Sequence, residues 1–209
     1  MMGGMTEIVL PATALVVLVG VSGSGKSTFA ASHFGATQIL SADGFRAIVA
    51  DDEADQGASR AAFELLHLAA RRRLERGRLT VIDATNVSRG ARSSLLALAG
   101  ATHRPAVAIV LDPPLAVCLG RNAARPGRTV DAAVVRRQHE MLQRTLAAAG
   151  GLAAEGFVGV ERLAEPDPGV FVTVVRRPGQ DASSAAPGTI DPAPRARRAP
   201  DEGGRPDDG

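Results

Sequence analysis

The residues best suited to chemistry in this 209-residue chain form a glycine-rich stretch near its N-terminus. Residues 20–27 read Gly-Val-Ser-Gly-Ser-Gly-Lys-Ser, which fits the pattern G-x-x-x-x-G-K-[ST] of loops that wrap around phosphate groups. Glycines let successive backbone N–H groups turn toward a phosphate chain, and a helix that begins there adds the positive end of its dipole. Lys26 is the only lysine among the 24 Lys and Arg residues. The stretch predicts a phosphate-binding loop, called here the P-loop (Gly20–Thr28).

The P-loop predicts a site for ATP and Mg²⁺. Lys26 should reach the β- and γ-phosphates, where its charge acts in catalysis, and the Ser27 hydroxyl is placed to ligate Mg²⁺. The context supports this, because an apolar run (Leu15–Gly20) precedes the loop and a helical pattern (Lys26–His33) follows it. The predicted nucleotide-binding residues are Gly20, Ser22, Gly23, Ser24, Gly25, Lys26, Ser27 and Thr28.

Two aspartates follow the ends of other predicted strands, Asp43 after Thr37–Ser41 and Asp83 after Leu79–Ile82. Ligands of open parallel sheets bind beyond the carboxyl ends of the strands, so both carboxylates are candidates for the same site. Asp43 could accept the proton of an attacking hydroxyl, or it could cap the next turn or contact a Mg²⁺-bound water. Asp83 competes for these tasks and fits better as the metal-site carboxylate, together with Ser27.

An arginine cluster lies between two predicted helices, around Pro126-Gly127. Its members are Arg121, Arg125 and Arg128. In a phosphotransferase a lid closes at such a place, and guanidinium groups there neutralise charge on the phosphoryl group in transfer. The alternative is a solvated arginine loop, which an arginine-rich chain also produces.

Composition limits the function classes. Formal net charge is +2, so no whole-protein field points to a polyanionic partner, and Phe is the only aromatic residue type, which argues against base stacking on exposed rings. A single cysteine, Cys118, excludes an internal disulfide and suits a reducing cytoplasm. The apolar run Ala12–Val19 is too short to span a bilayer, so no membrane association is expected.

Short apolar runs alternate with helical patterns up to residue 175, which predicts an α/β domain over residues 1–175. We expect a three-layer αβα sandwich with a mainly parallel sheet of about five strands and an arginine-bearing lid. Residues 176–209 are rich in Pro, Gly, Ala, Asp and Arg, and this predicts a disordered low-complexity tail. The expected strands also include Ala106–Leu111, Phe157–Val160 and Val170–Val175, with Ile8–Leu10 as a candidate edge strand.

Taken together, these motifs resemble the kinase domain of bacterial polynucleotide kinase-phosphatase, the P-loop enzyme that heals 5′ ends in an RNA repair system. The resemblance runs from about Leu15 to Leu163. Beyond the P-loop it rests on Ser-Ala-Asp-Gly-Phe-Arg (41–46), Val-Ala-Asp-Asp-Glu-Ala-Asp-Gln (49–56), Leu-Thr-Val-Ile-Asp-Ala-Thr-Asn-Val (79–87) and Val-Cys-Leu-Gly-Arg-Asn-Ala-Ala-Arg-Pro-Gly-Arg (117–128).

The resemblance implies ATP-dependent transfer of the γ-phosphoryl group to a 5′-OH end of RNA or DNA. It implies that Asp43 is the general base, that Arg46 holds the phosphate on the 3′ side of the terminal nucleoside, and that Arg121 and Arg125 bind the ATP phosphates from the lid. The family's enzyme continues into phosphatase and ligase modules, whereas this chain continues into a polar tail. Partner proteins with those activities would then act in trans.

Two other functions remain open at this point. The same fold and P-loop serve kinases of small molecules, of the gluconate, antibiotic or toxin type. A nucleotide-binding regulatory module, whose tail recruits a partner, belongs to a different class. Phosphorylation of an acceptor would distinguish both kinds of kinase from the regulatory module. A cation that binds the next phosphate of a nucleic-acid chain, here Arg46, would distinguish a polynucleotide acceptor from a small molecule.

Overall fold

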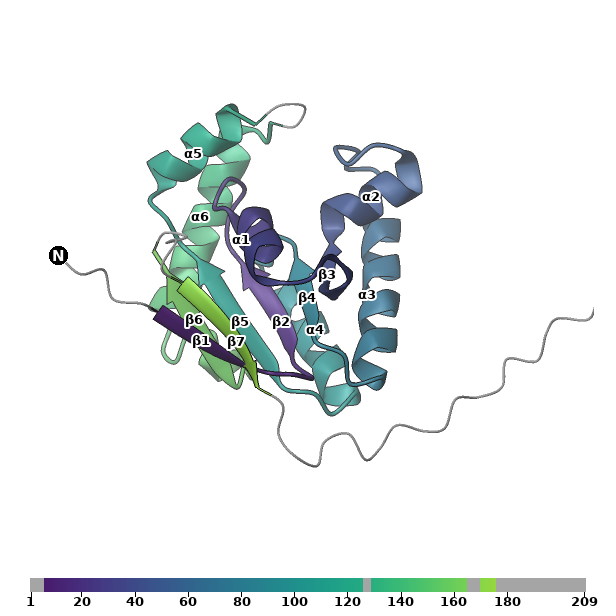
Figure 1. The fold of residues 1–209 in the computed structure, drawn as a ribbon. Helices are drawn as coiled ribbons and strands as arrows, with labels where there is room; N and C mark the ends of the chain where they lie inside the picture. The colour runs from purple at the N-terminus through teal and green to yellow at the C-terminus, as the bar shows by residue number, and fades with distance from the viewer. Residues whose placement is uncertain (1–5, 126–128, 165–169, 176–209) are drawn as a thin grey trace, which may run out of the picture.

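The computed structural model describes residues 6–125, 129–164 and 170–175, which form an α/β domain (Figure 1). The predicted tail, 176–209, lies outside the described residues. The elements in chain order are β1 (Thr6–Pro11), β2 (Leu15–Val19), α1 (Lys26–His33), the 3₁₀ turn η1 (Ala36–Gln38), β3 (Ile39–Ser41), α2 (Ala42–Ala50), α3 (Ser59–Glu75), β4 (Thr80–Asp83), α4 (Arg89–Ala101), β5 (Ala106–Leu111), α5 (Leu115–Ala123), α6 (Ala132–Ala147), the 3₁₀ turn η2 (Ala153–Glu155), β6 (Gly159–Leu163) and β7 (Val170–Val175).

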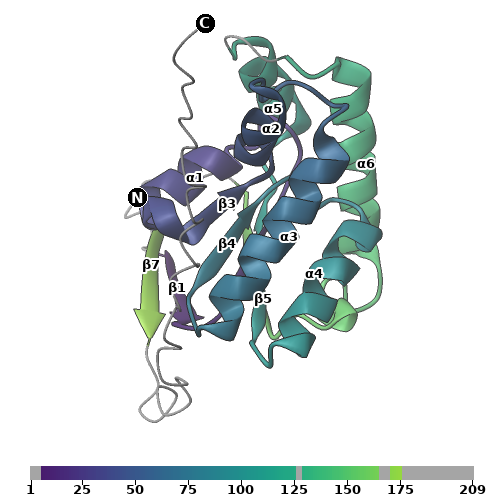
Figure 2. The ribbon, with the colours of Figure 1, turned by 90° about the vertical axis from the view of Figure 1, so that its right-hand side faces the viewer.

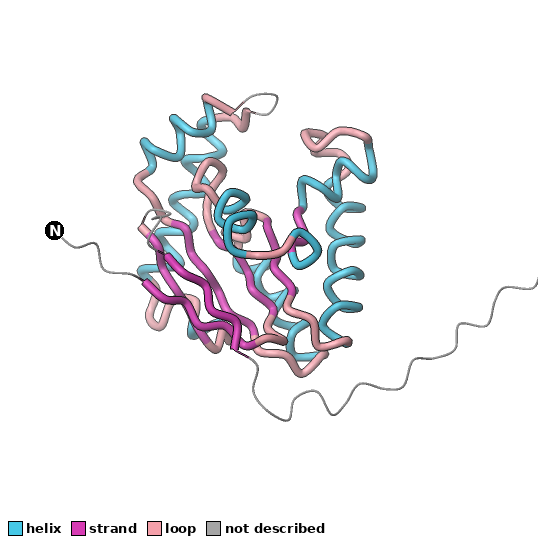
Figure 3. Tube along the Cα trace, viewed as in Figure 1, coloured by secondary structure: helices cyan, strands magenta, loops and turns pink. Residues whose placement is uncertain are grey.

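Five parallel strands form the central sheet in the order β3-β4-β2-β5-β6, which confirms the predicted fold class. The middle strands β2 and β5 are apolar throughout and buried along their whole length, as expected for strands covered on both faces. Because all five strands are parallel, their carboxyl ends reach the same edge of the sheet. The P-loop and the start of α2 lie above that edge (Figure 3).

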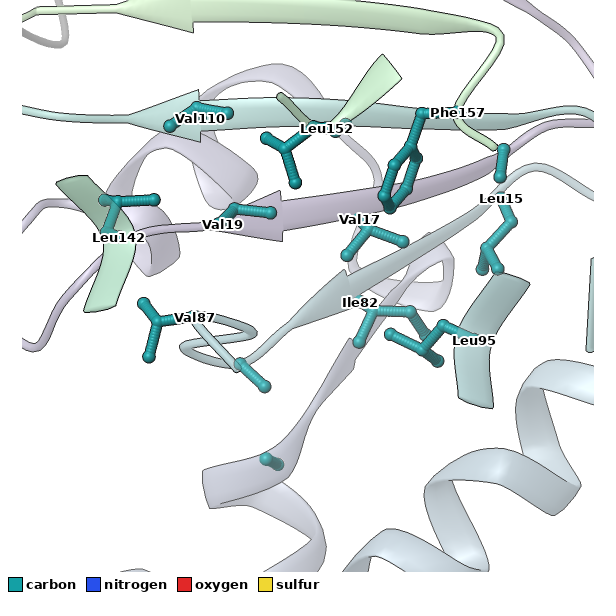
Figure 4. Close-up of a cluster of buried hydrophobic side chains, with 14 of the residues drawn as sticks. Leu15, Val17, Val19, Ile82, Val87, Leu95, Val110, Leu142, Leu152 and Phe157 are labelled. Atoms are coloured by element: carbon teal, nitrogen blue, oxygen red, sulfur yellow. The ribbon is translucent and has the colours of Figure 1, made fainter. Parts of the chain in front are cut away.

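Alternate residues of each strand face opposite sides of the sheet and form two separate cores. On one face Leu15, Val17 and Val19 pack with side chains of α3, α4 and α6, in the cluster drawn in Figure 4. On the other face Val16 and Leu18 pack with α1 and with β1 and β7. Figure 2 shows the sheet edge-on between these two layers.

The strand predictions at the two ends of the domain need a correction. The segments predicted as Ile8–Leu10 and Val170–Val175 do not join the central sheet, because β1 and β7 pair with each other as a separate parallel ribbon. The physical reason is burial: Ile8, Leu10 and Val170 are 4% exposed or less and cover the face of the central sheet beside α1. The ribbon thus completes an outer layer in which α1 is the helix.

A buried ion pair fastens the loop after β4 to the helical layer. Arg92 on α4 is fully buried and makes two hydrogen bonds to the Glu155 carboxylate, at 2.7 and 2.6 Å. The same guanidinium donates to the backbone oxygens of Asn86 and Val87, at 2.9 and 2.8 Å. These hydrogen bonds therefore fix the position of the loop that follows Asp83.

Among the described residues, no helix is long and apolar enough to cross a membrane.

Removing one partner of this pair should cost far more than removing an exposed one. We expect Glu155→Ala to lower the free energy of unfolding by about 3 kcal/mol, because it leaves the Arg92 charge buried without its counterion. The matched control is Glu140→Ala, since Glu140 pairs with Arg144 at 3.6 Å with both side chains exposed and should change stability by less than about 1 kcal/mol. Urea unfolding measures both, and similar losses would contradict the assignment.

Candidate functional site

The P-loop leaves β2 and turns sharply into α1. Gly23 and Gly25 have φ angles of 81° and 94°, a region that residues with a side chain rarely adopt. Space is also limited, because a Cβ on Gly23 would collide with the carbonyl oxygen of Cys118 on α5. A Cβ on Gly20 would lie 2.6 Å from the Leu111 carbonyl oxygen. These glycines are therefore required by the backbone path and by the close packing of α5 and β5.

Lys26 is the first residue of α1, and its side chain folds back over the loop. Its ammonium donates hydrogen bonds to the Val21 carbonyl oxygen at 2.8 Å and to Ser24 Oγ at 3.4 Å. The residue is only 8% exposed, so its charge acts in a partly desolvated site where electrostatic interactions are stronger than in water.

A pocket of about 440 Å³ opens at this edge of the sheet and brings most of the predicted site residues together. Its lining is formed by Ser22, Gly23, Gly25, Lys26, Ser27, Thr28, Asp43, Asp83, Ala84, Thr85, Arg121, Asn122, Arg125 and Val130. Three predicted site residues do not line it. Gly20 and Ser24 support the loop from within, and Arg46 lies behind Asp43.

Parallel pairing places the metal-site candidates beside the P-loop. Asp83 ends β4 opposite Ser41 of β3, is 6% exposed, and lines the pocket together with Ser27. In the part of the chain that the structure describes, no group of three or more His, Cys, Asp or Glu side chains is arranged to hold a metal ion. One hydroxyl and one carboxylate fit Mg²⁺, which takes most of its remaining ligands from phosphates and water.

Asp43 lies in the first turn of α2 and lines the pocket from this helix. The Ser41 side chain caps this helix by accepting the Gly44 N–H at 3.4 Å, so Asp43 is not the residue that caps the turn. Asp43 forms an ion pair with Arg46, one helical turn later. Arg46 is 4% exposed and its Nε donates to the Glu53 carbonyl oxygen at 2.8 Å. Burial lowers the pKa of Arg46, and the carboxylates of Glu53 and Asp55 oppose this shift.

The predicted lid segment, residues 124–131 between α5 and α6, carries Arg125 to the pocket, and Arg121 lines the pocket from α5. Arg128 lies outside the described residues. The Arg125 guanidinium lies 3.8 Å from an Asp43 carboxylate oxygen and 3.6 Å from a Glu53 carboxylate oxygen. Asn122 ties the two ends of the segment together, donating to the Val130 oxygen at 2.7 Å and accepting the Val130 N–H at 3.2 Å. In Figure 1, α5 and α6 stand on one side of the site and α2 and α3 on the other.

The structure adds residues to the site that the sequence motifs did not indicate. Asn122 lies beside a predicted arginine, but nothing in the sequence marks it as the tie across the lid segment. Gln138 on α6 accepts the Ser22 N–H at 2.9 Å although the two residues are 116 positions apart. Glu53 lies in the stretch 49–56 that carries part of the resemblance, but no role at the site was predicted for it. Contacts of this kind depend on tertiary packing and have no signal in local spacing.

The close approach at Gly23 gives a direct test of the site's geometry. We expect Gly23→Ala to raise the dissociation constant for ATP at least about tenfold, because both the positive φ and the Cys118 carbonyl force the loop to move. Gly90→Ala on α4 is the control, since a Cβ there meets nothing within 4 Å. Calorimetric titration with ATP and Mg²⁺ measures both variants. Unchanged affinity in Gly23→Ala would show that the loop does not bind the nucleotide.

Comparison with known proteins agrees with this geometry. A family model described as an AAA domain matches residues 15–148, more than half of the chain. A chain in the structure of the Pnkp1/Rnl/Hen1 RNA repair complex is 22% identical, with a TM-score of 0.55, over 66% of this chain and 45% of that one. Kti12 from Chaetomium thermophilum, solved with ADP-AlF3, is 16% identical with a TM-score of 0.54, over 73% of this chain and 90% of that one.

A sugar kinase from Janibacter sp. HTCC2649 is 24% identical with a TM-score of 0.49, over 75% of this chain and 88% of that one. No curated protein matches the chain. The chain spans less than half the length of the repair-complex chain that it matches, and at these identities the solved structures share its fold. The protein belongs to the AAA domain family matched over residues 15–148 and has the fold of P-loop kinases.

Proposed function

We propose that this protein transfers the γ-phosphoryl group of ATP to the 5′-OH end of RNA or DNA. The observation that carries the proposal is the pocket itself, in which a P-loop lysine, a helix-borne carboxylate and two lid arginines surround one volume of about 440 Å³. A phosphoryl group in transfer needs a cradle for the donor, a base for the acceptor and positive charge between them.

The donor side of the pocket fits a nucleoside triphosphate. The P-loop backbone and the N-terminus of α1 offer N–H donors, and Lys26 supplies a point charge for the β- and γ-phosphates. The Kti12 complex with ADP-AlF3 has the same fold and supports nucleotide binding here. Ser27 and Asp83 would hold Mg²⁺, which supplies charge neutralisation on the phosphates when it is bound.

The acceptor side fits the activation of a hydroxyl group. Asp43 would accept the proton of the attacking hydroxyl, while Arg46 fixes the orientation of the carboxylate from behind. Arg121 and Arg125 line the pocket between the two sides. Their guanidinium groups would stabilise the negative charge that spreads over the phosphoryl oxygens in the transition state.

Two observations support a polynucleotide as the acceptor. The motifs around Asp43, Asp83 and Arg121 resemble those of 5′-end-healing kinases, and a chain of an RNA repair complex has the same fold. The resemblance assigns the phosphate next to the 5′-terminal nucleoside to Arg46. Because Arg46 is 4% exposed and lies behind Asp43, this contact would require its side chain to move into the pocket when the acceptor binds. We propose that proteins with phosphatase and ligase activities act on the same RNA or DNA ends as this kinase.

A small-molecule acceptor is the second candidate. It is favoured by the acidic run 51–55, since Glu53 lies near Arg125 and Asp43 at the acceptor side and would repel a phosphate backbone. An uncharged sugar would meet no such repulsion. The two candidates therefore make opposite predictions about the charge of the acceptor.

The acceptor can be identified by a parallel transfer assay. Labelled ATP with Mg²⁺ is offered with 5′-OH RNA, 5′-OH DNA, a nucleoside 3′-phosphate, an unphosphorylated nucleoside and an uncharged sugar. We expect kcat/KM to be highest for oligonucleotides and at least about tenfold higher for the nucleoside 3′-phosphate than for the nucleoside, as one charge-assisted contact provides. Arg46→Ala should remove most of that difference and leave ATP binding intact. Preferred use of the uncharged sugar, or equal use of nucleoside and oligonucleotide, contradicts a polynucleotide acceptor.

A further inference from the structure

One peptide group of the P-loop, between Val21 and Ser22, is held at both ends. Its carbonyl oxygen accepts the Lys26 ammonium at 2.8 Å and also the Ser24 N–H at 3.1 Å. Its N–H donates to the side-chain oxygen of Gln138 at 2.9 Å. A peptide group is planar, so fixing the direction of its N–H also fixes the direction of its carbonyl oxygen. The position of the lysine ammonium is therefore linked to Gln138.

Gln138 lies on α6, the helix that follows the lid segment. The preceding helix, α5, also contacts the P-loop, since the Cys118 carbonyl oxygen occupies the space that a side chain on Gly23 would need. Asn122 joins the ends of the lid segment through its two hydrogen bonds to Val130. Both helices that carry the lid thus touch neighbouring P-loop residues, α6 at Ser22 and α5 at Gly23.

We infer that Gln138 is a positioning residue for nucleotide binding: through the Val21–Ser22 peptide it fixes the Lys26 ammonium and couples the lid helices to the P-loop. The inference rests on the proposed ATP site. Without the Gln138 acceptor, only the Ser24 N–H would restrain the direction of the Val21 carbonyl, and the anchor that aims Lys26 at the phosphates would be less firmly fixed.

The alternative is that Gln138 only contributes to the packing of α6. That role would weaken ATP binding by a similar factor whether or not the lysine is present. A role through Lys26 predicts strong coupling between the two residues, which a double-mutant cycle measures directly.

The test compares ATP·Mg²⁺ dissociation constants by calorimetric titration in Gln138→Met, Lys26→Met and the double variant. Methionine keeps the length of glutamine but removes the acceptor. We expect Gln138→Met to raise the dissociation constant about tenfold in the wild-type background and less than about twofold in the Lys26→Met background. Gln38→Met is the matched control, because Gln38 accepts the Gly35 N–H at the same 2.9 Å outside the pocket. It should bind ATP like the wild type.

A second variant guards against a folding defect in Gln138→Met, which thermal melting would reveal. Gln138→Glu keeps an acceptor oxygen and should bind ATP more tightly than Gln138→Met, despite its added negative charge. The inference is overturned if Gln138→Met loses affinity equally in both backgrounds, if it loses none, or if Gln138→Glu binds no better. Absence of ATP binding by the wild-type protein would instead overturn the proposed nucleotide site, so the two failures are distinguishable.

Discussion

The site depends on the parallel pairing of β2, β3 and β4. Their shared direction brings the ends of three buried strands to one edge, where the chain leaves each strand with a polar residue or a glycine turn. The register sets Ser41 opposite Asp83, so Asp43, in the first turn of α2, lines the same pocket as Asp83. A shift of this register would move the carboxylates of Asp43 and Asp83 away from the P-loop. No sequence motif spans the three segments, so the sheet alone brings them together. Sheet geometry thus does the positioning that the chemistry requires.

Charge is divided across the pocket. Lys26 and the α1 N-terminus make the P-loop side of the pocket positive, whereas Asp43 places a carboxylate on the α2 side, and Glu53 lies near it through Arg125. Arg125 lies between the two carboxylates, and Arg46 neutralises Asp43 from behind. In the proposed reaction, a triphosphate would attract the lid arginines more strongly than two partly exposed carboxylates do, because such surface pairs contribute little. Arg125 would then exchange acceptor-side contacts for phosphate contacts as the nucleotide binds.

The sequence predicted most of the fold because continuous apolar strands and helical periods are local signals. The β5 and α1 boundaries agree with the structure, and β3 is shorter than predicted because residues 36–38 form a 3₁₀ turn. The β1–β7 ribbon was not predictable, since pairing between the two ends of a domain leaves no mark on either segment. The site shows the same difference between local and long-range signals. The P-loop, Asp43 and Asp83 were predictable because they follow the ends of strands. The contacts of Gln138, Asn122 and Glu53 were not, because only tertiary packing creates them.

The central claim, that one pocket divides donor binding from hydroxyl activation, can be tested with two matched aspartate variants. ATP·Mg²⁺ affinity and single-turnover phosphorylation of a 5′-OH oligoribonucleotide are measured for Asp43→Asn and Asp83→Asn. The account predicts that Asp43→Asn keeps wild-type ATP affinity but loses ~10²–10⁴-fold in the rate of transfer, the usual effect of a lost general base. Asp83→Asn should lose Mg²⁺-dependent affinity instead. Near-wild-type transfer by Asp43→Asn, or a loss of ATP affinity in that variant, would contradict the division of the pocket.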